Sequence, residues 1–146
     1  MTWQVVGLFC EDVREETGGS HTLIGVMPDN LEIPSVPVAM PKLAFYIRAV
    51  VDPKTEIPAI SARLRFPDSS EVALGHFEPS VIAQTKTEAI IAGAPITGLI
   101  LRGAMSPFNI AGPGRVLLIA RFGDQDVLCG SINFGTAEMR HKVETS

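Results

Sequence analysis

The chain has 146 residues, of which 46% are hydrophobic and 19% charged, and its formal net charge is -4. This length and composition fit one folded domain with a single core, and they exclude a disordered chain. The negative charge argues against a general affinity for nucleic acids or anionic membranes, which attract proteins through Lys and Arg.

The first part of the chain predicts a β-hairpin followed by an extended segment. Residues 3–10 form an apolar strand, the glycine-containing residues 17–20 form a turn, and residues 21–27 form the returning strand. Four prolines fall within residues 28–41, and proline cannot donate a hydrogen bond to a central ladder. We therefore expect this segment to be a crossover or an edge segment.

The middle of the chain predicts a strand, a second hairpin and one irregular piece. Residues 42–51 alternate in part between apolar and polar side chains, and residues 59–66 alternate cleanly, as a half-buried strand does. Residues 67–70 have turn composition, and residues 71–77 return as the other strand of the hairpin. Residues 79–93 fit neither period well, and a short helix is one interpretation of them.

The last third predicts another strand, a short strand end and a third hairpin. The strand covers residues 96–105, and residues 108–114 form a strand end with a glycine-rich turn. Residues 115–122 and 127–134 flank a polar turn and form the hairpin. The apolar pattern stops after Phe134, so we expect the rest to be a frayed tail or a short terminal helix.

These elements predict an all-β fold. Seven or eight short strands separated by turns are typical of an antiparallel β-sandwich, in which two sheets pack face to face. A small β-barrel is the alternative. We expect one domain over residues 1–136 and a C-terminal tail over residues 137–146.

The reactive residue types give no catalytic site, metal site or cofactor site in this sequence. Cys10 and Cys129 lie in apolar strand-like runs, so we expect reduced, buried thiols, with a disulfide between them as the alternative. The histidines lie in separate segments without the spacing of metal ligands: they are His21, His76 and His141. No nucleophile has the sequence context of a hydrolase.

An acidic segment follows the first predicted strand. It consists of Glu11, Asp12, Arg14, Glu15 and Glu16. The segment lacks the alternating acids and the glycine of a calcium loop. On a strand, successive side chains point to opposite faces, so the four carboxylates do not converge. We interpret the segment as the solvated, structural end of a hairpin, with a cation site as the alternative.

A basic sheet face is the candidate binding site. Alternation places Arg48, Arg63 and Arg65 opposite the core face of two strands that follow each other in the sequence. If these strands pair, a basic stripe crosses one sheet beside Tyr46, where an acidic partner or a phosphate-bearing ligand could bind. We favour the alternative of a solvated face whose charges prevent aggregation.

Residues 9–49 resemble the opening of a family of small uncharacterised bacterial and phage-associated proteins. The shared pattern is a Cys-acid-acid-x-Arg-x-Glu run, a glycine turn, a Leu-x-Gly-Val strand and a Pro-x-x-Pro segment. The matching positions are Cys10, Glu11, Asp12, Arg14, Glu15, Gly19, Leu23, Gly25, Val26, Pro34, Pro37, Pro41, Lys42 and Leu43. A weaker similarity covers residues 108–126. The resemblance implies a β-sandwich and no particular activity, cofactor or functional residue.

We therefore expect a non-enzymatic β-sandwich that binds protein, either by self-association or as part of a phage or bacterial assembly. Sandwich edges offer unpaired backbone groups for strand addition, and residues 28–41 would protect one edge or carry the contact. The alternative is a small-ligand or carbohydrate-binding sandwich that uses the arginine-rich face. The sequence pattern predicts neither a signal peptide nor a membrane span, so we expect a cytoplasmic protein, or one in a virion or phage-encoded assembly.

Overall fold

A computed structural model of the chain describes residues 4–138. Eleven strands and one helix make up the regular structure of these residues. The elements are β1 (Gln4–Glu15), β2 (His21–Val26), β3 (Asn30–Ile33), β4 (Val38–Met40), β5 (Leu43–Val51), β6 (Ile60–Arg65), β7 (Glu71–His76), α1 (Pro79–Ile91), β8 (Thr97–Met105), β9 (Phe108–Ile110), β10 (Gly114–Phe122) and β11 (Gln125–Thr136).

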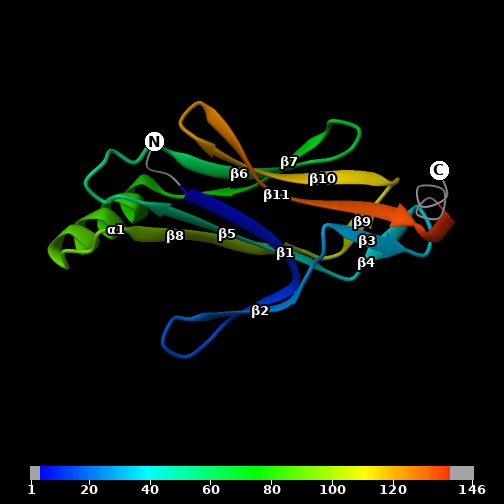
Figure 1. Ribbon diagram of the computed structural model, residues 1–146, viewed down its shortest axis with the longest axis horizontal. Helices are drawn as coiled ribbons and strands as arrows, with labels where there is room; N and C mark the ends of the chain where they lie inside the picture. The colour runs from blue at the N-terminus through cyan, green and yellow to red at the C-terminus, as the bar shows by residue number, and fades with distance from the viewer. Residues whose placement is uncertain (1–3, 139–146) are drawn as a thin grey trace.

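The strands form two main sheets that lie one above the other (Figure 1). Sheet A has the strand order β2-β1-β5-β8, and sheet B has the order β3-β11-β10-β6-β7. Neighbouring strands are antiparallel, except that β3 runs parallel to β11. Strands β4 and β9 form a separate two-stranded ladder. Both main sheets end in open edges, so the predicted all-β sandwich is confirmed and the small-barrel alternative is wrong.

The structure has more strands than the seven or eight that we predicted, because proline-rich and glycine-rich segments also contain short ones. Residues 28–41 supply β3 and β4, and residues 108–114 supply β9. β3 lies at the edge of sheet B, and proline is tolerated in and beside edge strands. The prediction of an edge segment is therefore confirmed.

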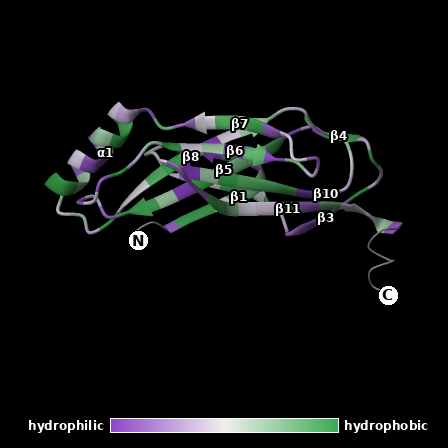
Figure 2. Cartoon of the chain, turned by 90° about the horizontal axis from the view of Figure 1, so that it is seen from above, coloured by the Kyte–Doolittle hydropathy of each residue, from purple (hydrophilic) through white to green (hydrophobic). Residues whose placement is uncertain are grey.

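The core lies between the two sheets, and the alternation of side chains creates it. In β5, Ile47 and Ala49 are buried, whereas the intervening Arg48 is exposed. Figure 2 shows the same alternation of apolar and polar residues along several strands. Leu64 and Leu118 from sheet B have no exposed surface. Burying each such side chain contributes about 1.5–3 kcal/mol, which makes this layer the main source of stability.

Helix α1 occupies the stretch whose periodicity was irregular, and it lies at one end of the sandwich (Figure 2). Pro79 is the first residue of the helix. Proline lacks an N–H, and the N–H groups of the first turn have no partner within a helix, so no hydrogen bond is lost there. Gly93 follows the end with a φ of 68°, the left-handed conformation that commonly terminates helices. Only Ile82 and Ala89 of the helix are buried, which explains the weak pattern. The helix is also too short to cross a membrane.

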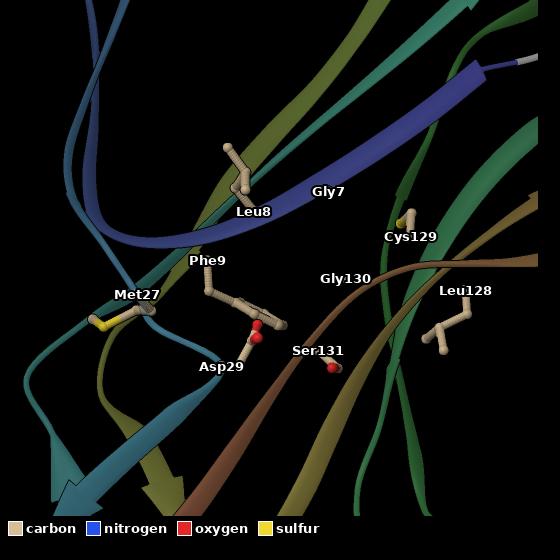
Figure 3. A pocket seen from close by; sticks show the side chains of 9 residues that line it. All are labelled: Gly7, Leu8, Phe9, Met27, Asp29, Leu128, Cys129, Gly130 and Ser131. Atoms are coloured by element: carbon tan, nitrogen blue, oxygen red, sulfur yellow. The ribbon is translucent and has the colours of Figure 1, made fainter.

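Strand β1 belongs to two ladders and bends between them. Its first part pairs with β5 up to Cys10, and the part from Cys10 to Glu15 pairs with β2. The strand curves sharply after Phe9 (Figure 3). Near the bend, Gly25 has a φ of 64°, and the side chain of Glu11 occupies the space that a Cβ there would need. The bend sends the hairpin back along the outer face of sheet A.

The C-terminal strand β11 extends to Thr136, and residues 137–138 are helical. The remainder of the predicted tail, including His141, lies outside the described residues.

Candidate functional site

Two acidic residues of the first hairpin pair with basic side chains from different parts of the fold. The carboxylate of Asp12 accepts a hydrogen bond from Lys42, and Nε of Arg14 lies 4.0 Å from the same carboxylate. This hydrogen bond is the main reason that the pKa of Asp12 is lowered. Glu15 Oε2 lies 2.9 Å from Nη2 of Arg102 on β8. In residues 4–138, no group of three or more His, Cys, Asp or Glu side chains is placed to hold a metal ion.

The hairpin end packs on the outer face of sheet A. The ring of His21 meets the ring of Tyr46 edge to face, with centroids 5.6 Å apart. Tyr46 is the direct partner of Arg102 in the β5–β8 ladder. The His21–Tyr46 contact and the Glu15–Arg102 ion pair therefore lie side by side on sheet A. The turn is closed by the N–H of Glu16, which donates to Ser20 O at 2.7 Å. These contacts agree with the interpretation of the acidic segment as a structural hairpin end, which stays a prediction.

The predicted basic stripe is not formed, because its two strands belong to different sheets. Strand β5 pairs with β1 and β8, whereas β6 pairs with β10 and β7. Arg48, like Tyr46, therefore lies on the outer face of sheet A, and Arg63 and Arg65 lie on the outer face of sheet B. The two strands are consecutive in the sequence, but the connection between them crosses from one sheet to the other.

Arg63 and Arg65 are engaged in an ion-pair network on sheet B. Arg63 donates to Glu71 at 2.7 Å and to both carboxylate oxygens of Asp126 at 3.1 and 2.7 Å. Arg65 also binds Glu71 at 3.1 Å. Hydrogen bonds from Arg63 are the main cause of the lowered pKa values of both acids. Ile119, the ladder partner of Arg63, is only 4% exposed, so the network covers apolar surface.

A pocket of about 370 Å³ lies where β1 of sheet A meets β11 of sheet B (Figure 3). We call it the seam pocket. Three segments line it: β1, the link between β2 and β3, and β11. The lining residues are Gly7, Leu8, Phe9, Met27, Asp29, Leu128, Cys129, Gly130 and Ser131.

Two glycines allow β1 and β11 to approach closely at this pocket. A Cβ added to Gly130 would lie 2.7 Å from the carbonyl oxygen of Gly7. A Cβ added to Gly7 would lie 2.9 Å from Sγ of Cys129. Cys129 donates to Leu118 O at 3.2 Å, and burial raises its pKa to about 11. Both cysteines are free thiols, so the disulfide alternative is not formed.

Backbone groups from both strands face the seam pocket. The carbonyl of Phe9 accepts a hydrogen bond from the N–H of Met27 at 2.8 Å. The backbone N–H and C=O of Phe9 therefore point away from β5. Peptide groups alternate in direction along a strand, so those of Gly7 also point away from β5. On β11, the N–H of Asn133 bonds to the residue before β3 at 2.8 Å. By the same alternation, the peptide groups of Ser131 point away from β10.

In residues 4–138, neither residues 4–9 of β1 nor residues 125–131 of β11 have a second ladder partner, although Gly7 is buried against Gly130. Residues 4–9 of β1 pair with β5 alone, and β3 pairs with β11 only over residues 133–136. Residues 125–131 of β11 therefore have β10 as their one partner strand in the described part of the chain. The proline-rich segment thus covers one half of the β11 edge and leaves the other half open.

Sequence reasoning missed these edge residues. It treated residues 129–133 as the interior of a strand and did not connect them with residues 3–10. An isolated glycine in a strand often marks a close approach of another backbone. Gly7 and Gly130 carry that signal, but neither reveals which strand approaches.

Comparison with known proteins gives a family but no activity. No curated protein matches the chain. A family model matches residues 5–103, which extend from β1 into β8 and include most of sheet A. The match agrees with the resemblance to an uncharacterised family, and it spans more than half of the chain. The chain therefore belongs to the family of unknown function DUF6941.

Proposed function

We propose that this protein is a non-enzymatic binding module that takes up an extended strand of a partner protein at the seam pocket. One observation carries the proposal: the open edges of β1 and β11 face the same pocket. An extended segment can add to such an edge through main-chain hydrogen bonds, while its alternating side chains provide specificity.

The composition of the β1 edge supports this proposal. Proteins usually protect open edges with charged residues, proline or a covering segment. Residues 4–9 contain neither a charged residue nor a proline. On β11, the side chain of Asp126 is held by Arg63 on the outer face of sheet B. Gly7 and Phe9 are buried, whereas Gln4 and Val6 are exposed, so the part of this uncharged edge that a partner strand would cover is its exposed start.

Apolar side chains around the pocket also suit a protein partner. Leu128 lines the pocket and is 60% exposed. Val6 and Val26, the neighbours in sequence of two lining residues, are each 52% exposed. Val6 pairs with Arg48 on the outer face of sheet A, whereas Leu128 pairs with Ile119 on the outer face of sheet B, so Leu128 is the exposed apolar side chain that the pocket itself offers to a partner. Covering Leu128 alone contributes about 1 kcal/mol, given roughly 1.5–3 kcal/mol for a completely buried side chain.

The partner is either a second copy of this chain or another component of a phage or bacterial assembly, in the cytoplasm or in a virion. The arginine-face alternative loses support, because Arg48 is separated from Arg63 and Arg65. Those two arginines also already bind carboxylates. A ligand on that face would have to break these ion pairs.

Site-specific photo-crosslinking tests the proposal. Benzoylphenylalanine replaces Leu128 in the full chain, and the same group at Ile91, which is 80% exposed on α1, is the matched control. We expect a discrete protein adduct from position 128 and none from position 91. Leu128→Lys should weaken that association at least fivefold, the equivalent of about 1 kcal/mol.

Light scattering after size-exclusion chromatography distinguishes a second copy from a different protein. A rise in mass with concentration that Leu128→Lys abolishes identifies self-association. A strict monomer that gives the same adducts at both positions would overturn the proposal.

A further inference from the structure

A second pocket, of about 470 Å³, shares no lining residue with the seam pocket. We call it the end pocket. It lies between the β6–β7 turn and the segment that runs from β9 into β10. Its volume falls within the range of about 300–1,000 Å³ that is common for small-molecule sites.

Aromatic rings form the floor and one wall of the end pocket. Phe108 and Phe134 are 4% and 1% exposed and lie at its base. Phe66 is half-buried and stacks on Phe108, with ring centroids 6.0 Å apart and planes inclined by 21°. Part of the Phe66 ring therefore remains accessible, so the pocket offers a flat apolar surface to a ligand.

A close contact holds the two walls together. A Cβ on Gly114 would lie 2.7 Å from Cγ of Pro67, so the proline ring packs directly on the glycine backbone. Gly114 has a φ of 131°, a conformation that other residues rarely adopt. The walls are thus joined independently of any ligand, and the pocket is preformed.

Among the described residues that line the end pocket, Asp68 alone carries a charge. Asp68 Oδ1 accepts the N–H of Ser70 at 2.9 Å and its hydroxyl at 2.6 Å. Oδ2 takes part in neither bond and remains available to a ligand. The side-chain bond from Ser70 is the main reason that the pKa of Asp68 is lowered, so the group stays ionised near neutral pH.

We propose that the end pocket binds a small organic cation whose apolar body is about the size of one aromatic ring, such as an arylalkylammonium. The ring of the ligand lies against Phe66 and Phe108, and its ammonium group binds Asp68. Ammonium groups are also attracted to the faces of aromatic rings. An anionic ligand of the same size is disfavoured, because Asp68 would repel it. This site is independent of the proposed strand addition.

Three probes of the same shape test the charge requirement: 2-phenylethylamine, 2-phenylethanol and phenylacetate. Chemical shifts of the protein amides are followed during titration with each probe. We expect the amine to bind about threefold to fivefold more tightly than the alcohol, as a solvent-exposed ion pair allows, and phenylacetate to bind most weakly. The largest shifts should occur around Phe66 and Phe108.

Two variants and a control complete the test. Asp68→Asn should remove the difference between amine and alcohol, and Ala111→Trp, at the exposed rim, should block all three probes. Asp124→Asn changes an exposed acid in the β10–β11 turn, outside the pocket, and should alter nothing. Equal binding of the three probes, or an unchanged preference in Asp68→Asn, would refute the proposal, as would shifts located elsewhere. Leu128→Lys should leave amine binding intact, which separates this result from the test of strand addition.

Discussion

Substitution of Gly130 tests the close approach of β1 and β11, on which the seam pocket depends. An alanine Cβ at this position would lie 2.7 Å from the carbonyl oxygen of Gly7 and 3.1 Å from its carbonyl carbon. Real Cβ atoms essentially never come within 3.0 Å of another group. Because the obstructing atoms belong to the backbone, no rotamer change relieves the contact, and the two strands must separate.

The expected cost follows from two opposing effects. Overpacking of this kind usually destabilises a protein by about 1–3 kcal/mol. Replacing glycine by alanine also lowers the entropy of the unfolded chain, which stabilises the folded state by about 0.4–1 kcal/mol. We therefore expect Gly130→Ala to lower the free energy of unfolding by roughly 1–2 kcal/mol.

Gly135→Ala is the matched control in the same strand. A Cβ there would meet nothing within 4 Å, and neither glycine has a positive φ. The control should be neutral or stabilise the protein by up to about 1 kcal/mol. Urea unfolding at a constant m value measures both changes. Equal unfolding midpoints for Gly130→Ala and Gly135→Ala would show that β1 and β11 do not meet as described.

Two further predictions concern titratable groups. Glu71 and Asp126 have lowered pKa values because Arg63 binds them, so their contribution to stability is present above the pKa values of the unfolded chain. This contribution is lost as the pH falls through the lower pKa values of the folded state. Asp126→Asn should therefore flatten the decline of the urea midpoint between about pH 5 and 3. A variant whose urea midpoint falls as steeply as that of the unmodified protein would argue against the network. Burial raises the pKa values of Cys10 and Cys129, so both thiols should react slowly with Ellman's reagent at pH 8 in the native protein and completely in urea without reductant. Rapid native reaction, or fewer than two thiols in urea, would contradict the structure.

Local patterns in the sequence determined the strands and their faces. The alternation in residues 59–66 placed Leu64 in the core and Arg63 outside, and the structure confirms both positions. Glycine and proline signals also located the hairpin turns, including Gly18 and Gly19, whose φ values are positive. These features depend on neighbouring residues, and a strand shows its period of two without reference to the rest of the chain.

Only the tertiary structure decided which strands are neighbours. The sequence could not show that residues 52–59 lead from one sheet to the other, so it left open a pairing of the Arg48 and Arg63 strands that the structure does not contain. The meeting of Gly7 with Gly130, and of Arg63 with Asp126, joins residues that are far apart in the chain. Such contacts form because whole apolar faces must be buried against each other. The choice of partner face depends on every strand at once, whereas each pattern in the sequence reports on a single strand.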